Sequence, residues 1–210
     1  MEKLSGLLEG QLHRAARIIR EGGTVVYPTE TVYGIGADAS SDKAVRRVFE
    51  CKKREDAKAI SILLPEVKCL RDYAIIPRTF NPEILLPGPV TLILALKQGN
   101  HRRHHNRISR LCVSEGGKAG FRVSSNPYAS LLASLSGCAI TSTSANISGS
   151  RAPSSHDEVS DELGADAIIS AGPTVFGMHS TVFDVTRMRI VREGVFDAQS
   201  IMSRLSGKKR

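Results

Sequence analysis

Short apolar runs of β-prone residues recur along the whole chain, and they constrain its fold more than any other feature. The runs are residues 24–27, 60–64, 90–96, 119–123, 139–143, 167–169, 181–185 and 190–192. Helical patterns lie between several of them, and alternation of strands with helices is typical of an α/β protein. The last runs follow one another without an intervening helix. We therefore expect a mixed sheet flanked by helices rather than a purely parallel sheet.

Apolar spacing and end signals place the first helices. Apolar residues three and four positions apart predict a helix over 12–20, which a Gly-Gly pair terminates. A second helix begins after Ser40 or Ser41, either of which can cap it, and Lys52 and Arg54 close it.

Two later helices carry clear start signals. Pro127 suits the first turn of a helix through Leu135, and the segment 155–158 has the form of a capping box for a helix reaching Leu163. The least regular segment, 100–117, is rich in His, Arg and Gly, and we expect it to be a long mobile loop.

Size and composition favour one compact unit. The chain has 210 residues with 41% hydrophobic content, enough for one domain, which we expect over 8–206. No apolar stretch approaches the roughly 20 residues that cross a bilayer, and the N-terminus lacks the apolar core of a secretory signal. The cysteines form no CxxC pair, so they suggest neither a zinc site nor a disulfide framework. We therefore expect a soluble, cytoplasmic protein with reduced thiols.

Positive charge points to anionic partners. Lys and Arg number 29 against 21 Asp and Glu, which gives a net charge of +8. A positive field attracts nucleotides and RNA alike, so charge alone does not separate ATP from tRNA. The cations gather in residues 52–54, in the basic loop within 100–117, and in a basic tail over 207–210.

The segment 27–36 follows the first strand and carries two threonine hydroxyls, a carboxylate and a phenol. We expect Gly34 to Gly36 to form a turn there. A strand-to-helix connection with internal turn bonding explains the same composition equally well. The segment resembles neither a Walker A loop nor a GxGxxG fingerprint, which disfavours the common phosphate-binding families.

Two further segments suit an anionic ligand. Lys52 and Arg54 offer a movable point charge and a planar fork, and at a helix end both can lean towards one triphosphate. Cations at a helix C-terminus are also favourable through the helix dipole alone. The hydroxyl-rich segment 141–150 follows an apolar strand and leads into a capped helix, so we favour a phosphate-docking loop over a flexible linker.

Polar residues also lie at the ends of the last strands, where open α/β sheets commonly form ligand crevices. His179 and Ser180 precede one strand, and Arg192 ends the other. A hydrolase triad is weakly supported, because no GxSxG elbow surrounds any serine. A metal site formed by the histidines of 101–105 is disfavoured, because the adjacent arginines repel a divalent cation.

Six motifs in their order and spacing resemble the YrdC-type threonylcarbamoyl-AMP synthase family, in its short single-domain form. They are Pro28-Thr29-Glu30-Thr31-Val32-Tyr33-Gly34, Lys52-Lys53-Arg54, Pro87-Gly88-Pro89-Val90-Thr91, Ser144-Ala145-Asn146, Ser180-Thr181-Val182 and Arg192-Glu193-Gly194. The resemblance implies a twisted α/β sheet around a positively charged cavity. It also implies that L-threonine, bicarbonate and ATP, assisted by Mg²⁺, give threonylcarbamoyl-AMP and pyrophosphate, for use by a transferase that modifies tRNA.

The same resemblance assigns roles to individual residues. Threonine would be held by Thr29, Arg122, Ser142 and Ser180. ATP would be bound by Lys52, Arg54, Lys118, Ser144, Asn146, Ser154 and Arg192, with Lys52 and Arg54 as the catalytic cations. No residue is assigned to a metal. The chain departs from the family pattern at Glu55, Ala59, Leu63 and Ser124.

Two other functions stay open on the residues alone. A non-catalytic module could hold tRNA or double-stranded RNA with the basic loop, and the net charge supports it, although few aromatic residues are available for base stacking. A carbamoyl-transfer domain of the hydrogenase-maturation kind normally accompanies acylphosphatase-like and zinc-finger regions. This chain has neither the room nor the cysteine spacing for them.

Overall fold

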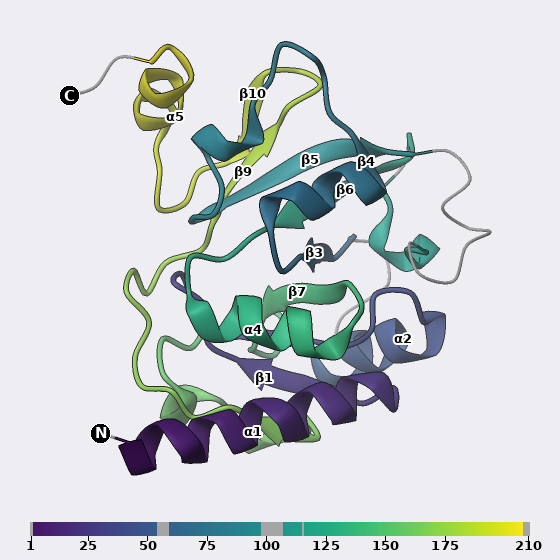
Figure 1. Ribbon diagram of the computed structural model, residues 1–210, viewed down its shortest axis with the longest axis vertical. Helices are drawn as coiled ribbons and strands as arrows, with labels where there is room; N and C mark the ends of the chain where they lie inside the picture. The colour runs from purple at the N-terminus through teal and green to yellow at the C-terminus, as the bar shows by residue number, and fades with distance from the viewer. Residues whose placement is uncertain (1, 54–58, 98–106, 115, 208–210) are drawn as a thin grey trace.

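A computed structural model of the chain describes residues 2–53, 59–97, 107–114 and 116–207 (Figure 1). Ten strands form one sheet in the order β10-β9-β5-β6-β3-β7-β2-β1-β8, with β4 paired to β5 beside this path. The strands are β1 Val25–Tyr27, β2 Gly34–Gly36, β3 Ser61–Leu63, β4 Ala74–Ile75, β5 Val90–Leu96, β6 Lys118–Arg122, β7 Ile140–Ser144, β8 Ala167–Ile168, β9 Thr181–Asp184 and β10 Arg189–Arg192.

The sheet is mixed, as the sequence predicts. Parallel pairs join β1 to β8, β3 to β6 and β5 to β9, and the remaining neighbours are antiparallel. The parallel pairs link strands that are far apart in the chain, so loops from distant segments meet at the middle of the sheet. This arrangement gathers the polar strand ends that the sequence singles out.

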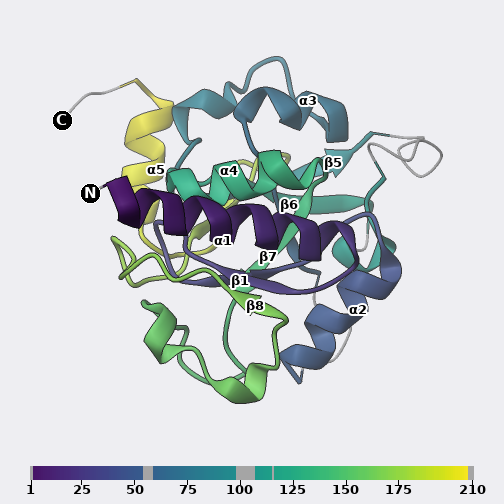
Figure 2. The ribbon, with the colours of Figure 1, turned by 60° about the horizontal axis from the view of Figure 1, so that its bottom comes forward.

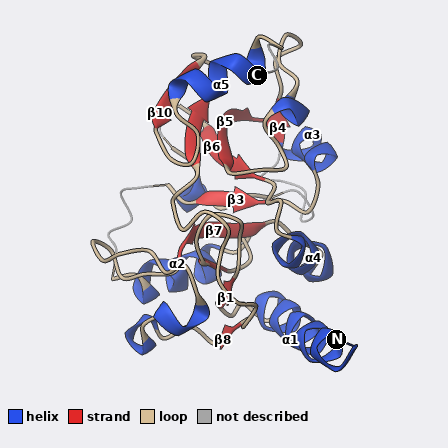
Figure 3. Cartoon of the chain, turned by 90° about the vertical axis from the view of Figure 1, so that its left-hand side faces the viewer, coloured by secondary structure: helices blue, strands red, loops and turns tan. Residues whose placement is uncertain are grey.

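Helices cover both faces of the sheet. They are α1 Glu2–Arg20, α2 Asp42–Cys51, α3 Leu70–Tyr73, α4 Pro127–Ser136 and α5 Ala198–Leu205. Helices α1 and α4 lie side by side over one face (Figure 2), and α2 lies on the opposite side of the strands (Figure 3). No helix in the described part of the chain is both long and apolar enough to cross a bilayer.

Apolar burial explains why these helices form where they do. Leu12, Ala16 and Ile19 are buried on one side of α1, in a cluster with Leu132 of α4 and Tyr27 of β1. Small alanines in both helices let them approach closely. A second, larger cluster packs α2 and the 70–86 segment against the sheet.

Local signals fix several helix ends. The Ser41 hydroxyl accepts a hydrogen bond from the amide of Ala44 at 3.2 Å, which caps α2 as predicted. Asn126 caps α4 in the same way through the amide of Tyr128 at 2.9 Å. Helix α1 begins well before the predicted residue 12, at Glu2.

The prediction of a turn at Gly34 to Gly36 is wrong. These residues form β2, which pairs antiparallel with both β1 and β7. Glycine is needed at position 36 because a Cβ atom there would lie 2.5 Å from the Thr141 carbonyl oxygen. Close strand approach, rather than chain reversal, explains the glycine.

One other prediction also needs correction. The 155–163 segment is not one capped helix but two short 3-10 turns, His156–Glu158 and Asp161–Leu163, and Ser155 makes no capping hydrogen bond. In the described part of the 100–117 segment, Arg110–Cys112 forms a 3-10 turn whose Cys112 is fully buried, and the mobility expected of this segment stays a prediction. Residues 100–106 and 115 lie outside the described chain, as do 208–210 of the basic tail.

Candidate active site

A polar cavity of about 510 Å³, including its opening to solvent, lies at the middle of the sheet. Its wall contains Arg122 at the end of β6, Ser142 on β7, Ser180 before β9 and Arg192 at the end of β10. The structure therefore brings together four of the predicted ligand-binding residues. They come from four strands and are spread over about 70 positions of the chain.

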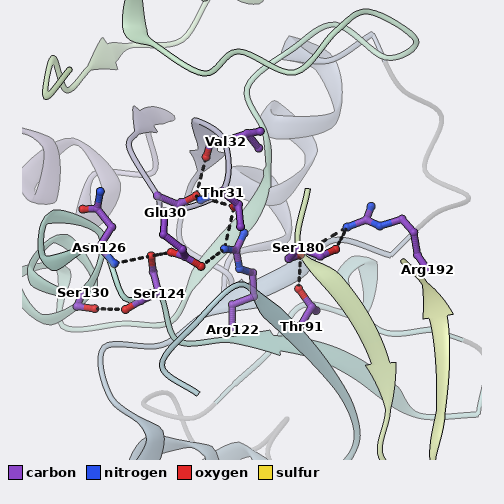
Figure 4. A network of polar contacts seen from close by, with 11 residues as sticks. Glu30, Thr31, Val32, Thr91, Arg122, Ser124, Asn126, Ser130, Ser180 and Arg192 are labelled. Atoms are coloured by element: carbon purple, nitrogen blue, oxygen red, sulfur yellow. Dashed lines mark hydrogen bonds and ion pairs between the residues drawn. The ribbon is translucent and has the colours of Figure 1, made fainter. Parts of the chain in front are cut away.

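Arg122 is the most buried cation in this wall, with 7% of the residue exposed. One terminal nitrogen, Nη2, donates to Glu30 Oε1 at 2.8 Å and to Thr31 Oγ1 at 3.0 Å (Figure 4). The Nε–H of the same side chain is buried and has no hydrogen-bond acceptor among the described residues. A buried unpaired donor costs about 1–3 kcal/mol, so Arg122 keeps unused hydrogen-bonding capacity beside the cavity that its side chain lines.

Thr29 does not line the cavity; its side chain contacts Thr31, which accepts a hydrogen bond from Arg122. The Thr29 hydroxyl donates to the Val32 carbonyl oxygen at 2.6 Å, so the Thr31 hydroxyl must donate across the 2.8 Å contact between the two side chains. The amide of Thr31 also donates to Thr29 Oγ1, at 3.1 Å. These bonds hold the loop after β1 rigid. Val32, from the same loop, and Arg122 line the cavity.

The opposite wall is built around Ser180. Its hydroxyl contacts the Thr91 hydroxyl at 2.9 Å, and its carbonyl oxygen accepts a hydrogen bond from Arg192 Nη2 at 2.9 Å. Figure 4 shows Arg192 reaching across the ends of β9 and β10 to this serine. Ser142 lies beside Ser61, its register partner on β3.

Lys52 meets the hydroxyl-rich segment directly. It caps the C-terminus of α2, and its Nζ donates to the carbonyl oxygens of Ser144 and Asn146, the latter at 2.7 Å. The Lys52 carbonyl oxygen accepts from the amide of Ser148 at 2.9 Å. The α2 terminus and the segment after β7 are thereby tied together, as the two predicted phosphate-binding motifs require.

Other predicted ATP ligands lie apart from this centre. Lys118, at the far end of β6 from Arg122, pairs with Asp184 at 3.2 Å and contacts the Thr186 hydroxyl. Ser154 donates to the Glu158 carboxylate through both its amide, at 2.7 Å, and its hydroxyl. Arg54 lies outside the described residues, as does Glu55.

The cations around the cavity lower the pKa values of two of its residues, His179 and Arg192. Partial burial lowers the pKa of His179 from its usual 6.5, and the charges of Arg192, Lys52 and Arg122 lower it further. Burial, and then the neighbouring Arg122, also lower the pKa of the Arg192 guanidinium. Three cations thus act on one cavity, which favours an anionic ligand.

Several residues of the wall have no role predicted from the sequence. Thr91, Ser61 and His179 line the cavity with the predicted residues. Thr91 ends the Pro-Gly-Pro-Val-Thr motif, and His179 precedes Ser180, so proximity to a motif was the available signal. Glu30 lies within the first motif and Ser124 is one of the departures from the family pattern, but nothing in the sequence predicts their contact, because it joins loops 94 positions apart.

The chain is similar to known proteins over most of its length. The Sua5_yciO_yrdC family model, described as telomere recombination, matches residues 17–194. The threonylcarbamoyl-AMP synthase of Pyrococcus abyssi is 32% identical over 186 residues, covering 85% of this chain and 52% of that protein. The Bacillus subtilis protein of the same name is 32% identical over 178 residues, covering 82% and 49%.

A solved structure agrees with these relatives. P. abyssi Sua5 complexed with L-threonine superposes with a TM-score of 0.83 and 32% identity, over 95% of this chain and 58% of that one. This chain therefore spans about half the length of the relatives described here. The match covers all the strands that build the cavity. Both the expected fold and the expected family are confirmed, and the chain belongs to the Sua5/YciO/YrdC family.

Proposed function

We propose that this chain is an L-threonylcarbamoyladenylate synthase, which makes threonylcarbamoyl-AMP and pyrophosphate from L-threonine, bicarbonate and ATP. The observation that carries the proposal is Arg122, whose side chain lines a cationic cavity and whose buried Nε–H has no acceptor among the described residues. The names of the relatives and the threonine complex of Sua5 support the same activity.

On the amino-acid side, Arg122 would bind the threonine carboxylate, because a guanidinium matches a carboxylate in both charge and geometry. The hydroxyls of Ser142 and Ser180 would contact the polar groups of threonine within the same cavity. Thr29 would act indirectly, because its hydroxyl holds the Thr31 side chain in contact with Arg122.

On the nucleotide side, Lys52 and Arg192 would face the triphosphate, and Arg54 would add a further cation. Ser144 and Asn146 would hold the nucleotide from the segment that Lys52 contacts. Ser154 and Lys118 would need to exchange their present carboxylate partners, Glu158 and Asp184, for ATP.

The chemistry needs cations and positioning more than a nucleophilic side chain. The threonine amine attacks bicarbonate and water leaves, which gives a carbamate. A carbamate oxygen then attacks the α-phosphorus, and the bond from that phosphorus to the departing pyrophosphate breaks. Charge accumulates on phosphate oxygens during this step, and fixed cations stabilise it. Holding the unstable carbamate beside ATP supplies the remaining advantage.

Mg²⁺ would enter with the triphosphate. The described residues contain no group of three His, Cys, Asp or Glu side chains placed to hold a metal, and those that line the cavity include no carboxylate. Mg²⁺ commonly keeps several waters and binds through substrate phosphates. We propose the same here, with the protein holding the phosphates.

The product would serve a transferase that modifies tRNA in the cytoplasm. The net charge of +8 is consistent with transient contact to tRNA or another double-stranded RNA. RNA binding without catalysis is the competing function, and it predicts steep salt dependence without affinity for ATP.

One assay separates these functions. The purified protein is incubated with ATP, Mg²⁺, bicarbonate and each amino acid in turn, and carbamoyl-adenylates are detected by mass. We expect a product with threonine alone. If none of the amino acids gave a product and the protein bound RNA tightly, the proposal would be contradicted.

Replacing Lys52 tests the phosphate side. We expect Lys52→Ala to reduce threonine-dependent pyrophosphate release by about tenfold or more, equivalent to ~1.4 kcal/mol of transition-state stabilisation. Lys53→Ala is the matched control, because the adjacent Lys53 side chain is 61% exposed and pairs with Glu162 on the surface. Equal rates in the two variants would remove Lys52 from the mechanism.

A further inference from the structure

Ser124 lies just beyond the end of β6, two positions after Arg122, and is buried with 2% exposed. Its hydroxyl donates to Glu30 Oε2, and its oxygen accepts a hydrogen bond from the amide of Asn126 at 3.1 Å. The amide N–H fixes the direction of the hydroxyl, because a serine has a single O–H to donate. That O–H is committed to Glu30 (Figure 4).

Glu30 is a carboxylate with 2% exposed, and its two oxygens have different partners. Oε1 accepts from Arg122 and Oε2 accepts from Ser124. A buried carboxylate needs donors at both oxygens. The Ser124 hydroxyl therefore keeps Oε2 turned away from Arg122, and the guanidinium shares only one oxygen with Glu30.

This division determines which donors of Arg122 stay available. Both N–H groups of Nη2 have acceptors, in Glu30 at 2.8 Å and Thr31 at 3.0 Å. The buried Nε–H has no acceptor in the part of the chain that the structure describes. If Oε2 lost its serine donor, the carboxylate could rotate and take the Nε–H in a bidentate pair, the geometry that guanidinium and carboxylate groups prefer.

We propose that Ser124 is a positioning residue for substrate binding, acting through Glu30 to hold the guanidinium of Arg122 in the orientation in which it lines the cavity and would receive the carboxylate of the amino acid. The inference rests on the proposed function of Arg122 as the carboxylate ligand. Ser124 would touch no substrate, yet it would set the affinity for threonine and leave the affinity for ATP unchanged.

A purely structural role predicts a different outcome. Ser124 also supports the start of α4, since its carbonyl oxygen accepts from the Ser130 hydroxyl at 3.0 Å. Loss of that support would weaken the fold and reduce the affinity for both threonine and ATP. Loss of the Glu30 contact would weaken threonine binding alone.

The test compares Ser124→Ala with Ser124→Thr, which keeps the hydroxyl, and with Ser125→Ala at the exposed neighbouring position. Pyrophosphate release gives KM for threonine and for ATP. We expect Ser124→Ala to raise the threonine KM by about tenfold, since small misplacements of a binding group have large effects. The ATP KM should stay unchanged, and the other two variants should behave like the wild type. An unchanged threonine KM, or equal rises for both substrates, overturns the inference.

A second measurement does not depend on catalysis. Nitrogen-15 NMR of the guanidinium groups reports rotation about the Nε–Cζ bond of Arg122, assigned with Arg122→Lys. We expect slow rotation and separate Nη signals in the wild type and in Ser125→Ala, with altered exchange and an altered Nε–H signal in Ser124→Ala. Identical Arg122 spectra in all variants overturn the inference even if the protein is active. A wild type that makes no threonylcarbamoyl-AMP overturns the proposed function, whereas the spectra still decide whether Ser124 controls Arg122.

Discussion

His179 lies at the exposed mouth of the cavity, directly before Ser180. Desolvation, and then the charges of Arg192, Lys52 and Arg122, hold its pKa below the usual 6.5. The imidazole is therefore neutral at pH 7, and it adds no fourth positive charge to the site. Its protonation below pH 6.5 would oppose folding, because the three cations are already in place.

This arrangement predicts a pH dependence of stability. As pH falls below 6.5, the unfolded chain protonates His179 before the folded chain does, so the free energy of unfolding decreases. The stability is fully present above pH 6.5. His179→Gln should flatten this slope relative to the wild type, which denaturant titrations at a series of pH values measure. The carboxylates with lowered pKa values, Glu158, Asp166 and Asp184, act at lower pH, because their usual values are 4.5 or below. An equal slope in the wild type and in His179→Gln would contradict the prediction.

At the scale of elements, the turn after β10 fixes the start of β9. Gly194 packs so closely on this strand that a Cβ atom would lie 2.2 Å from the His179 carbonyl oxygen and 2.5 Å from the Ser180 carbonyl carbon. The amide of Val195 also donates to that His179 oxygen, at 3.0 Å. The glycine of the Arg-Glu-Gly motif therefore sets the position of Ser180 through the backbone.

Gly194→Ala should displace the β9 start and carry Ser180 with it. We expect a loss of about 1–3 kcal/mol of stability, typical of overpacking a close contact, together with reduced turnover. Gly10→Ala is the control, since nothing lies within 4 Å of its added methyl group and alanine favours a helix. Thermal unfolding and pyrophosphate release measure the two effects. Normal values for Gly194→Ala would show that the strand start adjusts freely.

The sequence predicts most elements because their signals are local. Strand β5 matches its apolar run, 90–96, and Ser41 and Pro127 mark helix starts by chemistry that needs no tertiary contact. Strand β2 is missed because Gly-Ile-Gly has turn composition, and its strand conformation depends on β1 and β7 on either side. Tertiary pairing overrides local preference there.

The site is only partly predictable for the same reason. Arg122, Ser142, Ser180 and Arg192 meet in one cavity, but their convergence depends on strand order, which only the family resemblance supplied. Arg122 is oriented by the hydrogen bond that it donates to Glu30, which also accepts one from Ser124 on a separate loop. No periodicity in the sequence reports such contacts.

At the scale of the whole molecule, the four cysteines are free and spread widely over the structure. Burial raises the pKa of the Cys112 and Cys138 thiols to about 12, and it also raises the pKa of Cys51 and Cys69. Thiolate is the reactive form, so the folded protein protects all four positions. The expected single domain over 8–206 stays a prediction, and these thiols can test it.

Thiol labelling along a denaturant titration should show one transition. We expect slow reaction of the native protein with a disulfide reagent at pH 8, and four reactive thiols per unfolded chain. Cys112 and Cys138 should become reactive together, at the midpoint seen by circular dichroism. Fewer than four thiols would reveal a disulfide, and separate midpoints would indicate more than one folding unit.

The long-range parallel pairs have a consequence for how the protein is made. Val25 pairs with Ala167 and Val90 with Thr181, so these pairings cannot form until residues 167 and 181 have left the ribosome. Proteins with such high contact order fold slowly, since loop closure precedes the contacts that reward it. Nascent chains shorter than about residue 192 lack one wall of the cavity and keep β5 without its β9 neighbour. During translation, the β5 edge is therefore the surface that chaperones would need to shield.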